Sequence, residues 1–294
     1  MSKNERKNYK LDQSPFYRLS SKKILTHILK IPQEELKKLT QADTLYTERE
    51  ITGKNGKKRN IEIPDPLLKE VQKRIATLFS RVETPKFLFC PAKERSYIGN
   101  AKEHVSNAVV RNLDIQAYFP STSSRRVYWF FHEQMKCAPD IAGILTALST
   151  FKGRLPTGSP LSPMLSYYAH IDMWDAIRTI TREANCTLTV YMDDLTISGA
   201  NVPDRVMWQI KQQIHRCGLR YHKEKYYTGQ IREVTGIIIR DHELKLPNRQ
   251  HLKIHQLCQH ISRESDPKQR AKLRQQLQGC IAQAQQIAAS NQTH

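Results

Sequence analysis

The sequence contains no apolar run close to the roughly 20 residues that a membrane-spanning helix needs, and its first seven residues, MSKNERK, include no apolar signal segment. Cysteine is also sparse: the six cysteines are scattered through 294 residues, and no two of them form a C-x-x-C pair. Scattered thiols of this kind are typical of reduced core residues rather than of a disulfide framework or a zinc ribbon. We therefore expect a cytoplasmic protein without membrane association.

Acidic residues are few relative to basic ones. The chain has 47 Lys and Arg residues against 28 Asp and Glu residues, which gives a formal net charge of +19. Such an excess favours a polyanionic partner, because each phosphate that a protein neutralises releases a condensed counterion. A membrane surface is the competing explanation, but the sequence shows no amphipathic anchor or lipidation signal. Nucleic acid is the partner that the composition favours.

The sequence divides into a basic helical segment (1–45), a central part with most of the expected strands, and a basic, Gln-rich helical tail that begins at Pro247. In the central part, strand, helix, long helix, hairpin, helix and strand alternate around one sheet. This order predicts an α+β fold with a split βαβ core. The finer expectations are a hairpin with a basic tip (46–63), a long helix (164–180), a helix (206–217) that Gly218 stops, and a late strand (233–240).

Two adjacent acids, Asp193 and Asp194, lie between two short runs that alternate polar and β-branched or apolar residues. The runs, Thr187–Val190 and Leu195–Ser198, predict the arms of a β-hairpin with the acids at its turn. Two like charges in one small volume repel each other unless a cation lies between them. A metal site is one interpretation, and a solvated turn is the other, because Asp-Asp is ordinary in turns.

A third acid, Asp114, lies near the end of an apolar run that predicts a buried strand. It could cap the following turn, or it could join Asp193 and Asp194. Three carboxylates from two neighbouring strands would suit two Mg²⁺ ions, since Mg²⁺ combines few carboxylates with substrate phosphates and water. Such an ion pair stabilises the attacking and leaving oxygens of a phosphoryl displacement. Together with the positive charge, the three acids predict phosphoryl transfer on nucleic acid.

Three segments then occur in the order of reverse transcriptase motifs A, B and C: LDIQAYF (113–119), LPTGSPLSP (155–163) and YMDD (191–194). Two more, NAKEH (100–104) before motif A and VTG (234–236) towards the end, match elements characteristic of retron reverse transcriptases. The match covers most of the chain, from about residue 45 to the end. The sequence thus resembles the retron-type reverse transcriptases, which are bacterial RNA-directed DNA polymerases.

This resemblance implies a right-hand polymerase fold with fingers, a ferredoxin-like palm and a helical thumb. Fingers and palm would occupy residues 46–240, and an RNA-binding thumb residues 241–294. The resemblance also implies two Mg²⁺ ions held by Asp114, Asp193 and Asp194, with the backbone carbonyl of Ile115 as a further ligand.

Nucleotide binding is implied for residues of three segments. In the basic hairpin, Lys54 and Arg59 would grip the triphosphate, for which a guanidinium is well suited. Phe119 matches the steric gate that rejects a 2′-hydroxyl, although it could equally be a core aromatic. Gly158 and Ser159 would bring backbone amides towards the nucleotide.

The chain departs from the family pattern in motif B. Thr157 stands where the family usually has Gln, and the shorter hydroxyl puts in doubt a contact from this position to nucleotide or template. Motif A also differs, with Gln116 and Ala117 where acids are common. Neither change removes a metal carboxylate.

The remaining implied roles concern proton transfer and RNA. Lys225 matches the lysine of motif D, a candidate general acid for the leaving pyrophosphate, although it could be a surface lysine held near phosphate. Recognition of the cognate RNA would involve residues of the two retron elements and of the tail: Asn100, His104, Val234, Thr235, Gly236 and Lys253.

The function that the resemblance implies is copying part of a cognate structured non-coding RNA into single-stranded DNA from dNTPs. Priming from a guanosine 2′-hydroxyl would leave a branched RNA–DNA product. A role in anti-phage defence with a separately encoded effector is also implied, and template removal would depend on a host RNase H. Two alternatives remain open: another defence or abortive-infection reverse transcriptase, and a catalytically silent RNA-binding scaffold with a polymerase-like fold.

Overall fold

The computed structural model describes residues 8–41, 45–53, 56 and 58–292. Two short helices begin the described chain, α1 (Lys22–Leu29) and α2 (Gln33–Gln41), which confirms the helical segment predicted there. The antiparallel hairpin β1 (Tyr46–Thr52) and β2 (Lys58–Pro64) follows, as predicted. Helix α3 (Pro66–Phe79) then begins with Pro66 in its first turn, where the missing N–H costs nothing.

A five-stranded sheet lies at the centre of the molecule, with strand order β3-β5-β6-β4-β7. Its strands are β3 (Leu88–Cys90), β4 (Val109–Ile115), β5 (Thr187–Tyr191), β6 (Asp194–Gly199) and β7 (Tyr221–Tyr227). The edge strand β3 pairs in parallel with β5, and the other pairings are antiparallel. The predicted β5–β6 hairpin and the buried strand β4 are therefore confirmed, and the fold mixes helices and strands as expected.

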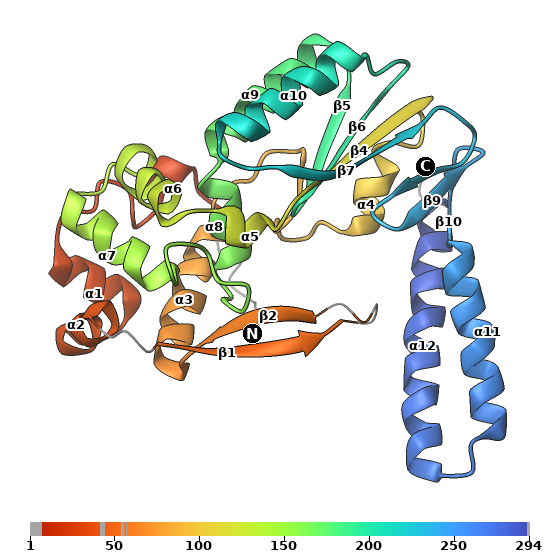
Figure 1. Cartoon of the computed structure of the whole chain (residues 1–294), viewed down its shortest axis with the longest axis horizontal. Helices are drawn as coiled ribbons and strands as arrows, with labels where there is room; N and C mark the ends of the chain where they lie inside the picture. Colours follow the sequence, from red (N-terminus) through yellow and green to blue (C-terminus); the bar gives the residue numbers. More distant parts are fainter. Residues whose placement is uncertain (1–7, 42–44, 54–55, 57, 293–294) are drawn as a thin grey trace, which may run out of the picture.

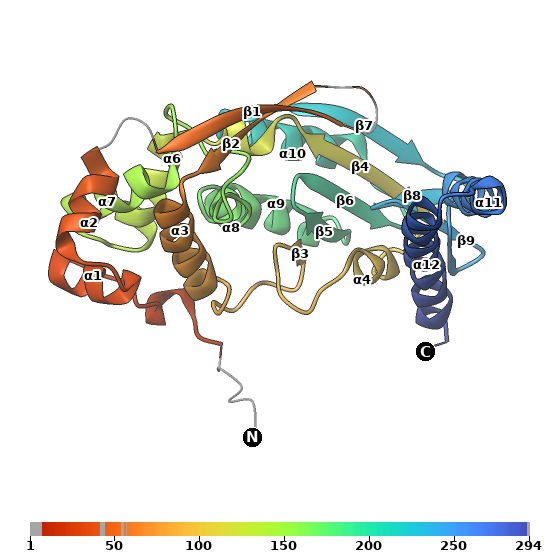
Figure 2. The same ribbon diagram turned by 90° about the horizontal axis from the view of Figure 1, so that it is seen from below.

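Helices cover the sheet mainly on one side. Figure 1 shows α9 (Ile171–Glu183) and α10 (Asp204–Arg216) side by side over that face, and Figure 2 shows the sheet from the opposite side. The apolar side chains Val206, Ile210 and Ile214 of α10 are buried at helical spacing. Gly218, with φ of 76°, ends the helical stretch, as the sequence predicted.

The central part contains further helices besides α3, α9 and α10. They are α4 (Tyr97–Lys102), α5 (Tyr118–Ser121), α6 (Ser124–Trp129), a π-helical turn (Phe130–Gln134), α7 (Pro139–Ser149) and α8 (Ser162–Tyr168). One large core unites α5 to α8 with the N-terminal helices and the sheet, and its fully buried side chains include Trp174, Phe79 and Phe130. Helix α4 instead packs its Ala101 into a second, smaller core with Val234 and Ile237.

Two expected elements are wrong in their continuity. The long helix predicted at 164–180 is two helices, α8 and α9, separated at Ala169 and His170. The strand predicted at 233–240 reverses at Thr235 and Gly236, whose φ values are 45° and 79°. Two consecutive residues with positive φ close a tight hairpin turn, so this stretch is β8 (Arg232–Val234) and β9 (Ile237–Arg240).

The predicted helical tail consists of two helices. After β10 (Glu243–Lys245), which extends the β8–β9 hairpin into a three-stranded sheet, come α11 (Asn248–Arg263) and α12 (Pro267–Ser290). The pair projects from the same side of the central sheet as the β1–β2 hairpin (Figure 1). The end of α12 returns to β10, where the Asn291 amide pairs with both backbone groups of Leu244. Among the described helices, none is long and apolar enough to cross a bilayer.

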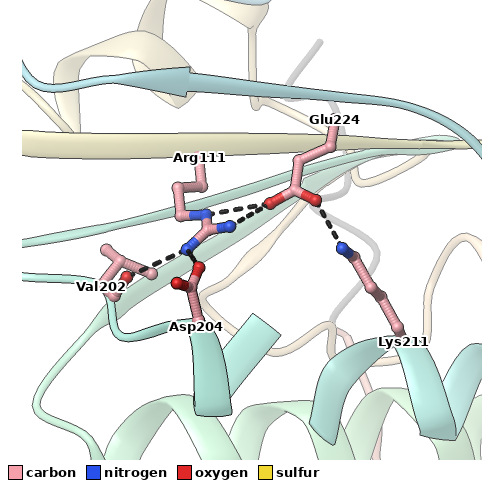
Figure 3. Close-up of polar contacts among 5 residues, drawn as sticks. All are labelled: Arg111, Val202, Asp204, Lys211 and Glu224. Carbon is pink, nitrogen blue, oxygen red and sulfur yellow. Dashed lines mark hydrogen bonds and ion pairs between the residues drawn. The ribbon is translucent and has the colours of Figure 1, made fainter. Parts of the chain in front are cut away.

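An ion network around the buried Arg111 joins the sheet to α10 (Figure 3). The side chain of Arg111 on β4 is only 9% exposed and binds both Glu224 on β7, at 2.5 Å, and Asp204 at the start of α10, at 2.6 Å. The other oxygen of Glu224 accepts a hydrogen bond from Lys211 of α10, at 2.5 Å. The Arg111 guanidinium also lies over the Tyr226 ring. These contacts fix β7 against β4 and α10.

Glu224→Ala is expected to destabilise the fold by about 3 kcal/mol, because Arg111 and Lys211 would lose the anion that they share. The measurement is urea-induced unfolding of the purified protein. The matched control is Asp175→Ala, which breaks an exposed pair with Arg178 and should change the free energy of unfolding by less than about 0.5 kcal/mol. Equal effects of the two substitutions would contradict the importance given to the network.

Candidate active site

The two adjacent acids lie at the turn of the β5–β6 hairpin. Tyr191 pairs with Asp194, so Met192 and Asp193 form a two-residue loop, and Met192 has a φ of 62°. Positive φ is what such tight hairpins require, although it is unfavourable for a non-glycine residue. The Met192 N–H donates to the Cys90 carbonyl at 3.1 Å, and the Asp193 carbonyl accepts from the Ile115 N–H at 2.9 Å. Both neighbouring strands thus hold the turn in place.

Asp114 lies directly opposite Asp194 in the β4–β6 register. Residues opposite each other on paired strands project to the same side of the sheet. Asp193 is close enough to Asp114 for the two charges to interact. The structure therefore brings together the three acids that the sequence singled out.

The protonation of this cluster reflects its surroundings. Loss of solvation, followed by repulsion from Asp193 and Asp114, raises the pKa of Asp194 to about 6, and nearby Lys225 opposes the shift. Loss of solvation is also the main cause that raises the pKa of Asp193, to which Asp114 adds, while Arg59 opposes it. A cation bound between such carboxylates would offset their mutual repulsion and stabilise their ionised forms.

The carboxylate oxygens of the three acids suit a hard cation that takes its remaining ligands from substrate and water. Within the described part of the chain, no three His, Cys, Asp or Glu side chains lie close enough to hold one ion by themselves. Mg²⁺ does not need such a cage, because it binds one or two carboxylates and completes its shell with substrate phosphates and water. The carboxylates of Asp114, Asp193 and Asp194 fit that chemistry.

One cavity, of about 380 Å³, lies over the face of the sheet that carries Asp114 and Asp194. In the β4–β7 register, Lys225 stands opposite Asn112 and Lys223 stands opposite Asp114, and all four side chains line this cavity. The predicted Lys225 is thus placed beside the acids. Lys223 is a second candidate that the sequence analysis missed, although strand alternation from Lys225 would have found it.

A second cavity, of about 640 Å³, lies on the other side of Asp114, towards the β1–β2 hairpin. Arg59, Phe119, Thr157 and Asp193 are among its lining residues. Arg59 and Phe119 thus lie at the same cavity as Asp193, Phe119 is partly exposed, and their contacts with the nucleotide stay a prediction. Lys54, also predicted to bind nucleotide, falls outside the described residues.

In the motif B loop, the residue that lines the second cavity is not one of those predicted to contact the nucleotide. Thr157, whose role the sequence left in doubt, lines the second cavity, whereas Gly158 and Ser159 are absent from its lining. A Cβ on Gly158 would overlap the backbone carbonyl of Glu62 on β2. The buried Ser159 hydroxyl bonds to the Gln72 side chain on α3, at 2.7 Å. Gly158, which is partly exposed, and the buried Ser159 thus contact strand β2 and helix α3, and the predicted approach of their backbone amides to the nucleotide stays a prediction.

His104 is fully buried, so its predicted contact with RNA needs correction. Its Nδ1 lies 2.5 Å from the Ser198 hydroxyl and its Nε2 lies 2.7 Å from the Thr189 hydroxyl. Burial lowers the pKa of His104 to about 3, so the ring is neutral at neutral pH. The imidazole ties the chain after α4 to both strands of the hairpin whose turn carries Asp193 and Asp194.

The two retron elements contact each other. The Asn100 amide lies 3.4 Å from the Thr235 hydroxyl, which donates to the Tyr97 carbonyl at 3.0 Å. Asn100 and Val234 are buried, which corrects their predicted direct RNA contact, whereas Thr235 and Gly236 line the first cavity. Lys253 is exposed on α11, as an RNA contact would require.

Comparison with known proteins gives the same family. A model of the reverse transcriptase (RNA-dependent DNA polymerase) family matches residues 51–239. The chain is 31% identical over 152 residues, half of its length, to the retron Se72 reverse transcriptase of Salmonella heidelberg (strain 579083-10). It is 25% identical over 215 residues, 71% of its length, to the retron Ec86 reverse transcriptase of Escherichia coli.

A further relative, the retron Mx162 reverse transcriptase of Myxococcus xanthus, is 25% identical over 230 residues, 67% of this chain. The aligned regions span 39%, 67% and 47% of the three relatives' own lengths. The matched region, residues 51–239, includes Asp114, Asp193 and Asp194. It also includes Lys225 of the first cavity and Arg59 of the second. As the motifs predicted, the chain belongs to the reverse transcriptase family and is of the retron type.

Proposed function

We propose that this chain is an RNA-directed DNA polymerase that copies part of a cognate structured RNA into single-stranded DNA. The observation that carries the proposal is the opposed pair Asp114 and Asp194, with Asp193 in the adjoining turn and a cavity lined by Arg59 beside it. Carboxylates on one side of a cavity and a guanidinium on the other suit a nucleoside triphosphate with its metal ions.

In this proposal the chain is a right-handed polymerase. The β1–β2 hairpin and its supporting helices correspond to fingers, the five-stranded sheet with α9 and α10 to a ferredoxin-like palm, and the α11–α12 pair to a thumb that follows the duplex. The boundaries are those expected from the sequence, 46–240 for fingers and palm and 241–294 for the thumb, after the basic segment 1–45.

Each site residue would have a separate role in nucleotidyl transfer. Asp114, Asp193, Asp194 and the Ile115 carbonyl would hold two Mg²⁺ ions, which stabilise the attacking and leaving oxygens when bound. Arg59 would bind the triphosphate, and Phe119 would exclude a ribose 2′-hydroxyl by contact. Lys225, or its neighbour Lys223, would donate a proton to the leaving pyrophosphate.

The RNA would be held by Thr235, Gly236 and Lys253. The buried Asn100, His104 and Val234 would keep the surrounding segments in position. By analogy with the family, the priming group is a guanosine 2′-hydroxyl of the same RNA, and the product is branched. We further propose a cytoplasmic role in anti-phage defence with a separately encoded effector, and template removal by a host RNase H.

Asp193→Asn is expected to reduce dNTP incorporation by at least about 10³-fold, because it removes a charged metal ligand worth several kcal/mol in the transition state. RNA affinity, measured by filter binding, should stay within about twofold. The matched control is Asp175→Asn, an exposed acid on α9. Activity that survives Asp193→Asn would show that the metal assignment is wrong.

Nucleic acid that copurifies with the protein is expected to contain a branched RNA–DNA molecule. The measurement is sequencing combined with a debranching enzyme, which should separate one RNA from one DNA of defined sequence. Unbranched DNA of random sequence would favour a different defence reverse transcriptase. RNA without attached DNA, from a protein that incorporates no dNTP, would favour a silent scaffold.

Asp194→Asn is expected to stabilise the metal-free protein at pH 7, raising its melting temperature by about 2 °C. The native pKa of about 6 lies above the ordinary value of 3.8, so ionising Asp194 lowers wild-type stability as pH rises from about 4 to 6. The gain should therefore vanish near pH 4. Thermal unfolding in EDTA checks this, and added Mg²⁺ should stabilise only the wild type. A variant less stable than wild type at pH 7 in EDTA would contradict the charge repulsion.

A further inference from the structure

Glu62 is a buried acid on the β1–β2 hairpin, most of whose other side chains are exposed or half-buried. Its side chain is only 3% exposed. A carboxylate removed from water is costly unless hydrogen bonds or opposite charges compensate for the lost solvation. The partners of Glu62 therefore indicate what this acid holds in place.

Among the described residues, the side-chain hydrogen-bond partners of Glu62 are Thr157 of the motif B loop and Arg154, which immediately precedes that loop. Its Oε2 accepts from both the backbone N–H and the hydroxyl of Thr157, at 2.9 Å and 2.7 Å. Its Oε1 accepts from the Arg154 guanidinium at 3.1 Å. The Thr157 hydroxyl also lies 3.0 Å from the Asn60 carbonyl. Strand β2 and the loop are thus joined through one carboxylate.

The next two loop residues, Gly158 and Ser159, add contacts to this junction between strand β2 and the motif B loop. Gly158 lies so close to the Glu62 backbone that no side chain fits between them. Ser159 bonds to Gln72 on α3, and Gln72 in turn donates to the Leu148 carbonyl at 2.9 Å. Three consecutive residues of the loop therefore contact the hairpin or the helix that follows it.

The junction forms part of the wall of the cavity beside Asp193. Arg59 lies three residues before Glu62 on the same strand, and both Arg59 and Thr157 line the 640 Å³ cavity. A shift of β2 relative to the loop would move Arg59 away from the acids. Holding a cationic group to within a fraction of an ångström is what a nucleotide site needs.

We propose that Glu62 is a positioning residue for the incoming nucleotide: by binding Thr157 and Arg154, it holds strand β2 and its Arg59 against the motif B loop that faces Asp193. The inference rests on the proposed polymerase function. It also gives Thr157 a role that needs no long side chain, because its short hydroxyl reaches Glu62 and leaves the cavity open.

Glu62 holds the loop in its ionised form. Burial alone would raise the pKa of Glu62, but the hydrogen bonds from Thr157 and Arg154 outweigh that effect and keep its pKa below the ordinary value of 4.5. The charged acceptor therefore persists throughout the neutral range, and its contribution to stability is lost only as pH falls below about 4.5.

The test measures dTTP incorporation on poly(rA)·oligo(dT) with Mg²⁺ for Glu62→Gln and Thr157→Val. Each variant removes a charge-assisted hydrogen bond, and we expect the KM for dTTP to rise about tenfold with kcat within about twofold. Thr157→Ser keeps the hydroxyl and should restore a KM close to that of the wild type. Hydrogen exchange of the amides at 155–159 should speed up in Glu62→Gln.

The matched control is Glu48→Gln, on strand β1 of the same hairpin. Glu48 pairs with Lys152 close to the same loop, but its side chain is 44% exposed, so its loss should leave the KM unchanged. An unchanged KM in Glu62→Gln and Thr157→Val, or an equal rise in Glu48→Gln, would overturn the inference. A wild-type chain that incorporates no dTTP would instead overturn the proposed function, while the exchange rates would still show whether Glu62 holds the loop.

Discussion

The register of strand β4 against strand β6 is the constraint on which the site depends. Asp114 and Asp194 meet only because they are direct partners in this antiparallel pair, and a slip of one residue would turn one of them to the opposite face. Contacts away from the acids fix each strand of this pair to its other neighbours. Arg111 fixes β4 to β7 and α10 through charged groups, and His104 fixes the far end of the β5–β6 hairpin through two hydroxyls.

Three carboxylates show how one chemical group takes different roles in this fold. Glu62 and Glu224 are surrounded by donors, so their pKa values are lowered and they act as anions that join elements. Asp194 has lost solvation and has acids for neighbours, with one opposing lysine, so its pKa is raised. The first environment stabilises the metal-free fold. The second is unfavourable until a cation is supplied, which is typical of functional sites.

Short-range pattern predicted much of the architecture. The alternation around Asp193 and Asp194 gave the hairpin with its turn, and helical spacing gave α10 with its stop at Gly218. The sequence pattern did not predict where one helix or strand ends and the next begins. Apolar residues continue through 164–180 and 233–240, so periodicity alone does not reveal the break at Ala169 and His170 or the turn at Thr235 and Gly236, which depends on two positive φ values.

The sequence by itself determined the family, the three acids and the preference for a polyanionic partner, because these follow from residue identity, order and charge. Tertiary structure alone decided which motif residues face the cavities. It placed His104, Asn100 and Ser159 inside the protein and Thr157 in a cavity wall, and it revealed Glu62 as the partner of the motif B loop. Burial and hydrogen bonding between residues some 90 positions apart depend on how the chain packs, and no local pattern records that packing.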